Sequence, residues 1–93
     1  MANFTKSDLS LDYTWTAAAN DDNAKITGFP DNIYLNRHEG YEVLHFLNRY
    51  MTGKNWSDKP TLNKLEKEVR DSKSGQKRKH SEVKVWLDEN FTK

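Results

Sequence analysis

The sequence contains no cysteine, only four glycines and only two prolines. Without cysteine the chain has no disulfide framework, no thiol nucleophile and no cysteine-based zinc site. The glycines stand at positions 28, 40, 53 and 75, too far apart to form a phosphate-cradling loop, and no Gly-x-Ser-x-Gly motif is present. These absences favour a protein that is not an enzyme and that carries no cofactor.

Long hydrophobic runs are also missing. No segment approaches the roughly 20 apolar residues of a membrane span, and the polar N-terminus lacks the apolar run of a secretory signal. We therefore expect a soluble, cytoplasmic protein. Hydrophobic residues make up only 34% of the 93 residues, but three Trp, four Tyr and four Phe compensate because aromatic side chains bury large areas. This composition predicts one small domain over residues 1–93 that folds without metals.

The net charge of +1 hides a gradient along the chain. Residues 1–31 carry two basic and five acidic side chains, for a net charge of −3. Residues 32–93 carry thirteen basic and nine acidic side chains, for a net charge of +4. Basic residues concentrate in the segment SKSGQKRKH, whose serines and glycine predict a flexible basic loop over residues 73–80.

The segment from Asn36 to Gly53 carries the clearest structural signals. Asn36 predicts a helix N-cap, Glu39 completes a capping box, and Gly53 predicts a left-handed stop. Together they predict a helix over about 37–52. At about 100° per residue, one wide apolar arc is expected to face the core. This arc contains Gly40, Val43, Leu44, Phe46, Leu47, Tyr50 and Met51.

The opposite side of this helix carries a polar stripe of His38, Glu42, His45 and Arg49. Two imidazoles and a carboxylate on one face suggest a metal-dependent activity at His38, Glu42 and His45. The spacing, however, is not that of ligands in adjacent turns around one ion, and Arg49 adds a repelling charge. A solvated face is the preferred interpretation, and we expect no metal site.

Near the N-terminus, Leu9, Leu11, Tyr13 and Trp15 alternate with polar residues. This period of two predicts a β-strand. A turn-type cluster at residues 20–23 and a short apolar return at residues 24–28 extend the prediction to a β-hairpin over residues 9–28. Residues 1–8 are expected to fray.

Two further helices are predicted, over about 58–72 and about 81–91. The first has Asp58 as its cap and a narrow apolar stripe of Leu62, Leu65 and Val69. Its charges at i, i+4 spacing indicate exposed ion pairs, namely Lys64–Glu68, Glu66–Arg70 and Lys67–Asp71. The last helix carries an apolar side that is expected to dock through Trp86, consisting of Val83, Trp86, Leu87 and Phe91.

Because a two-stranded hairpin is marginal alone in water, the helices must cover its apolar face. The predicted fold is therefore α+β: an N-terminal β-hairpin packed on three helices, with residues 36–93 forming the helical part.

The basic loop is the strongest functional signal. Its cations precede the N-terminus of the last predicted helix, where backbone N–H groups and the helix dipole also favour an anion such as phosphate. A Trp outside any apolar face, Trp56, is a candidate for stacking on a base of single-stranded nucleic acid. The preferred function is a non-catalytic, nucleic-acid-associated accessory or regulatory module. The candidate binding residues are Lys73, Lys77, Arg78, Lys79 and Trp56.

The alternative function is a protein-binding adapter or inhibitor. It would use Trp56 and the acidic hairpin tip with Asp21 and Asp22, because an exposed Trp often anchors a partner. A homodimer fits this alternative. A small, cysteine-free, charge-rich domain is typical of prokaryotes and mobile elements.

Overall fold

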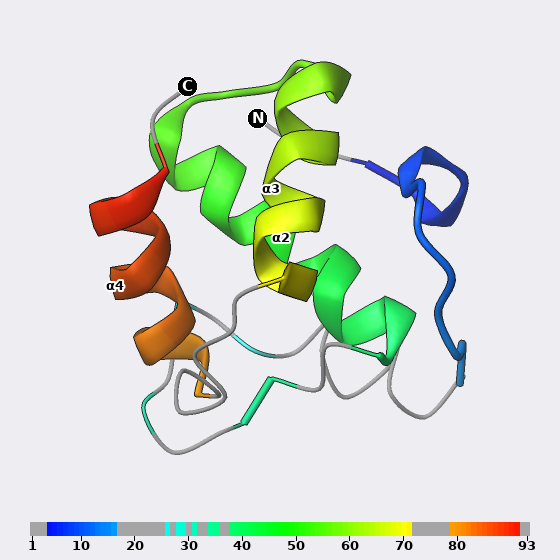
Figure 1. Ribbon diagram of the computed structural model, residues 1–93, viewed down its shortest axis with the longest axis horizontal. Coiled ribbons are helices and arrows are strands. Elements are labelled where there is room, and N and C mark those ends of the chain that lie inside the picture. The colour runs from blue at the N-terminus through cyan, green and yellow to red at the C-terminus, as the bar shows by residue number, and fades with distance from the viewer. Residues whose placement is uncertain are drawn as a thin grey trace.

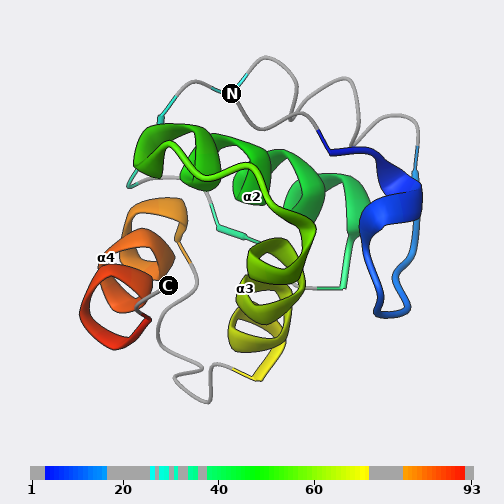
Figure 2. The same ribbon diagram turned by 90° about the horizontal axis from the view of Figure 1, so that it is seen from above.

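The structure is a computed structural model, and it describes residues 4–16, 26, 28, 29, 31, 34, 35, 38–71 and 79–91. These residues contain a 3-10 turn and three α-helices: η1 (Lys6–Asp8), α2 (Gly40–Lys54), α3 (Lys59–Asp71) and α4 (His80–Asn90). Helix α2 lies across α3 and α4, which run on the same side of it (Figures 1 and 2). The described part of the chain is all-α and has no β-strand, so the predicted α+β fold is wrong.

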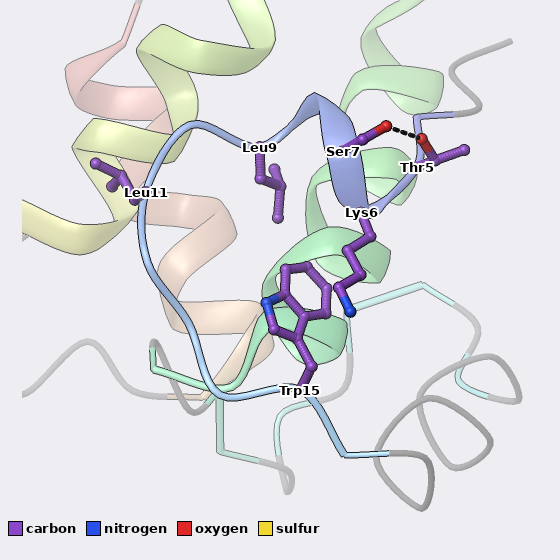
Figure 3. A pocket seen from close by; sticks show the side chains of 6 residues that line it. All are labelled: Thr5, Lys6, Ser7, Leu9, Leu11 and Trp15. Carbon is purple, nitrogen blue, oxygen red and sulfur yellow. Dashed lines mark hydrogen bonds between the residues drawn. The ribbon is translucent and has the colours of Figure 1, made fainter.

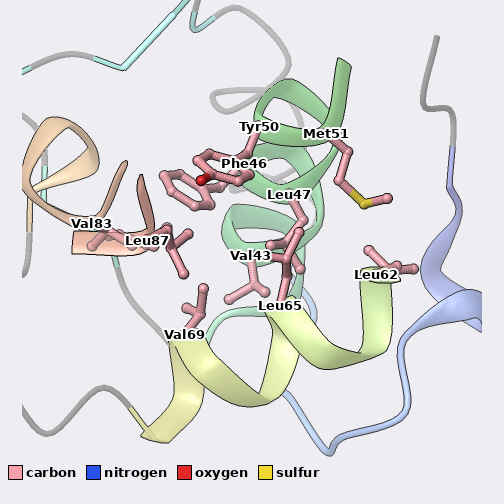
Figure 4. Packing of buried hydrophobic residues seen from close by; sticks show 11 residues of the cluster. Val43, Phe46, Leu47, Tyr50, Met51, Leu62, Leu65, Val69, Val83 and Leu87 are labelled. Carbon is pink, nitrogen blue, oxygen red and sulfur yellow. The ribbon is translucent and has the colours of Figure 1, made fainter. Parts of the chain in front are cut away.

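The core lies between the three helices (Figure 4). Every residue of the apolar arc predicted for α2 is buried, so the prediction of its core-facing side is confirmed. On α3 the predicted stripe of Leu62, Leu65 and Val69 is buried as well. Each helix buries its apolar side, because this burial removes hydrocarbon from water. The backbone N–H and C=O groups of the helix meanwhile form hydrogen bonds with one another.

The ends of α2 differ from the prediction. The helix begins at Gly40 with Glu39 as its N-cap, and the Glu39 carboxylate accepts a hydrogen bond from the Tyr41 backbone N–H. The predicted cap, Asn36, lies outside the described residues. Gly53 is helical, and the helix stops at Asn55, whose φ of 61° is left-handed. Asn adopts the left-handed conformation more readily than most other non-glycine residues, because its short polar side chain can form local hydrogen bonds there.

The last two helices begin close to where the sequence places them. The Asp58 carboxylate caps α3 by accepting hydrogen bonds from the backbone N–H and the hydroxyl of Thr61. Helix α4 begins at His80 and buries Val83 and Leu87 completely. Trp86 is only partly buried, so α4 docks through its smaller aliphatic residues, with the indole packed at their edge.

The N-terminal segment, residues 4–16, is extended beyond η1, but it does not form a strand. From Leu9 to Thr16 the odd-numbered residues are half-buried and the even-numbered ones are exposed, as the period of two predicts. The predicted hairpin is nevertheless wrong. The segment pairs with the helical part at one isolated parallel bridge, between Thr14 and Glu39. Residues 17–25 lie outside the described part, and Ile26 and Gly28 belong to no strand.

The backbone of the N-terminal segment bonds instead to Glu66 on α3. This carboxylate is 0% exposed and accepts hydrogen bonds from the N–H groups of Ser10 and Leu11, both at 2.9 Å, and from the Tyr13 hydroxyl at 2.7 Å. Burial raises the pKa of Glu66, but the donated hydrogen bonds outweigh burial and leave the pKa below its ordinary value. The prediction of an exposed Glu66–Arg70 ion pair is therefore wrong, because Glu66 is buried.

Arg70 and Asn48 fasten the same segment at two other points. The Arg70 guanidinium lies 4.7 Å from the centre of the Tyr13 ring and donates to the Asp12 carbonyl at 2.7 Å. The Asn48 amide on α2 exchanges two hydrogen bonds with the backbone of Phe4, at 2.8 and 3.0 Å. Side chains of α2 and α3 thus replace the second strand that the sequence suggested.

Candidate nucleic-acid interface

Of the four predicted basic residues, the structure describes one. Lys79 is the N-cap residue of α4. Lys73, Lys77 and Arg78 lie outside the described residues, as do Asp21 and Asp22 of the predicted acidic tip.

Lys79 lies beside an exposed aromatic side chain. Its backbone forms an isolated antiparallel bridge with Tyr34, and its Nζ is 5.8 Å from the centre of the Tyr34 ring. Tyr34 is 61% exposed, whereas its neighbour Leu35 is 4% exposed and belongs to the core. Leu35 therefore anchors the short segment and leaves the Tyr34 ring at the surface next to a cation.

His80, the first residue of α4, fixes the start of this helix against α2. Its imidazole is 0% exposed, packs against the Phe46 ring, and its Nδ1 lies 2.9 Å from Nη2 of Arg49. Burial, with the nearby charge of Arg49, lowers the pKa of His80 to about 4. The imidazole is therefore neutral near pH 7, and Nδ1 accepts a hydrogen bond from the guanidinium.

The cap of α4 uses the backbone of Lys79 and not its ammonium group. The Lys79 N–H donates to the Glu82 carboxylate at 3.3 Å. The backbone hydrogen bond thus fixes the position from which the Lys79 side chain reaches over Tyr34. A substitution can remove the charge of Lys79 without removing the hydrogen bond that caps the helix.

Trp56 packs onto the core. Its ring is partly buried and makes edge contacts with Tyr50 and Phe91, at centroid distances of 6.3 and 5.9 Å. These contacts fasten the connection between α2 and α3 to the end of α4. The aromatic side chain that sequence reasoning missed is Tyr34, because its apolar neighbours Ile33 and Leu35 make the triplet resemble core, and periodicity does not say which of three apolar residues faces outward.

The predicted polar stripe is divided in the structure, because His38 precedes α2, and the part on α2 is partly used within the protein. Arg49 donates to the Gly28 carbonyl at 3.0 Å in addition to its contact with His80. Burial and the charge of Arg49 lower the pKa of His45. No group of three or more His, Asp or Glu side chains in the described part of the chain is arranged to hold a metal ion, and this includes His38, Glu42 and His45.

Comparison of the chain with known protein families, with curated proteins and with solved structures found no match. Among the residues that the structure describes, no helix has both the length and the apolar character needed to cross a membrane.

Proposed function

We propose that this protein is a non-catalytic module that binds nucleic acid in the cytoplasm, through a surface formed by Tyr34 and Lys79. The supporting observation is the pairing of a 61% exposed tyrosine ring with a lysine ammonium 5.8 Å from its centre. An aromatic face stacks on a base of any sequence, and a neighbouring cation neutralises the phosphate beside it.

The sequence around Lys79 adds positive charge to this proposal. Lys77 and Arg78 directly precede it in the chain and Lys73 stands six positions before it, all in the segment that the sequence predicts to be a basic loop. Four phosphate contacts would give weak, strongly salt-dependent binding with little sequence preference. Stacking requires an unpaired base, so single strands are the preferred substrate over duplexes.

The test of the stacking contact is a pair of variants at Tyr34, measured by fluorescence anisotropy with a labelled single-stranded oligonucleotide at low salt. Tyr34→Ala should lower affinity by about 1–3 kcal/mol, because it removes the ring. Tyr34→Phe should bind like the wild type, because it keeps the aromatic face. Equal binding by all three proteins would contradict a stacking role for Tyr34.

Lys79→Ala should act differently. It should reduce the slope of log affinity against log salt by about 0.7 on a single strand, because one fewer counterion-releasing contact is made. Lys64→Ala, which removes an exposed cation from α3, is the matched control and should leave the slope unchanged. If the folded wild type binds no DNA or RNA at low salt, the proposal fails and a protein-binding adapter or inhibitor, as a monomer or a homodimer, takes its place.

A further inference from the structure

An open depression of about 500 Å³ lies on the N-terminal segment, away from Tyr34 and Lys79 in the sequence (Figure 3). The depression is open to solvent, so a ligand would be covered on one side only. All of its lining residues come from the N-terminal segment: Thr5, Lys6, Ser7, Leu9, Leu11 and Trp15.

The lining combines an apolar surface with one cation. Leu9, Leu11 and the Trp15 indole supply the apolar part, and the Lys6 ammonium lies 5.0 Å from the centre of the indole ring. Lys6 makes no ion pair with an acidic side chain of the described residues. The hydroxyls of Thr5 and Ser7 lie 3.1 Å apart and bond to each other (Figure 3), and the Thr5 hydroxyl also donates to the Asp8 carboxylate at 3.2 Å, so Lys6 is the polar group left for a ligand.

The wall of the depression is fastened to the helices near each end. Glu66 holds Ser10 and Leu11, and Asn48 holds Phe4. The Trp15 ring lies so close to Gly40 that a Cβ at position 40 would stand 2.5 Å from the ring atom Cε2. The indole is thus packed closely against α2 at Gly40, and a ligand would bind to a surface that is already formed.

We propose that this depression binds a small amphipathic carboxylate, that is, an apolar chain ending in one negative charge. The apolar chain would lie on Trp15 and Leu9, and the carboxylate would meet the ammonium of Lys6. A single ammonium group matches one negative charge, whereas a compact inorganic anion would leave the apolar part of the lining uncovered. This proposal is independent of nucleic-acid binding because no residue is shared between the two sites.

Titration with octanoate, followed by two-dimensional amide NMR of the full chain, tests the proposal. Octanoate should shift the amide signals of the N-terminal segment, with the largest changes between Thr5 and Trp15. Octanol has the chain without the charge and should bind more weakly, and inorganic phosphate should produce no shifts there. Octanol binding as tightly as octanoate, or phosphate shifting the same amides, would overturn the proposal.

A variant at Lys6 supplies the second measurement. Lys6→Met keeps the aliphatic stem and removes the charge, so the affinity for octanoate should fall by about three- to fivefold while the affinity for octanol stays the same. Lys64→Met on α3 is the matched control and should bind octanoate like the wild type. Unchanged octanoate binding by Lys6→Met would exclude the proposed contact, and because Lys6 is exposed the variant is expected to fold.

Discussion

The N-terminal segment and the helical core must both pair their backbone N–H and C=O groups and bury apolar side chains, but they do so in different ways. Each helix bonds its own backbone and contributes apolar side chains to a shared interior. The N-terminal segment bonds much of its backbone to side chains of α2 and α3, chiefly the buried carboxylate of Glu66. The helical core is therefore held chiefly by apolar contacts, whereas the N-terminal segment is held by hydrogen bonds together with the partly buried side chains of Phe4, Leu9 and Tyr13. The two regions should respond differently to substitution and to pH.

The largest difference should come from the same leucine truncation in the two regions. Leu47→Ala, in the fully buried core, should lower the free energy of unfolding by about 2–5 kcal/mol, because it leaves a cavity. Leu11→Ala, on the half-buried N-terminal segment, should cost about 1 kcal/mol or less. Urea titrations measure both values, and equal losses would contradict the division into a packed core and a polar-bonded segment.

Glu66→Gln should release the N-terminal segment while the helices stay folded. The amide cannot accept all the hydrogen bonds that the carboxylate accepts from Ser10, Leu11 and Tyr13, and a loss of about 2–3 kcal/mol is expected. Amide hydrogen exchange should show faster exchange at Ser10 and Leu11 and little change in the middle of α2. Unchanged protection at Ser10 would show that the segment is held by its apolar side chains alone.

Acidification should weaken the two regions in different pH ranges. The pKa of His80 is lowered to about 4, so the stability from its neutral form is present above its unfolded pKa of 6.5 and is lost as the pH falls toward 4. Between pH 7 and pH 5 this loss should reach about 2 kcal/mol. His45, whose pKa is also lowered, contributes in the same direction.

The contribution of Glu66 should persist to lower pH. Its folded pKa is lowered from 4.5, so its hydrogen bonds stabilise the N-terminal segment above that value and are lost only as the pH falls below it. Denaturant titrations at pH 7 and pH 5, with an NMR titration of the histidine rings, check the order. A flat stability between these pH values would contradict the neutral, buried state of His80.

The smallest expected effect is a change in stability on replacing a glycine by alanine, and it should have opposite signs at Gly53 and Gly40. Gly53→Ala should raise stability by about 0.5–1 kcal/mol, because position 53 is helical and a Cβ there meets no atom within 4 Å. Gly40→Ala should lower stability, because its Cβ would displace the Trp15 ring. Thermal melts of both variants are sufficient, and a destabilising Gly53→Ala would restore the predicted stop at that position.

Part of the candidate site was predictable. The charge pattern identifies the basic segment and Lys79, since clustered cations before a helix are visible in any linear sequence. Tyr34 was not predictable, because its exposure depends on Leu35 entering a core made by distant helices. Trp56 has no periodic apolar neighbours, and its contact with Phe91, far along the chain, could not be derived from local pattern.

The sequence by itself determined the three helices and the apolar side of each, because helical periodicity and the Asp58 cap are local properties of the chain. It also determined that residues 9–16 alternate between inside and outside. Tertiary structure alone decided what those residues bond to. A period of two requires an extended backbone but does not identify its hydrogen-bonding partner. Here that partner is Glu66, more than 50 positions away, which a helical pattern places on the surface and which only the docked segment buries.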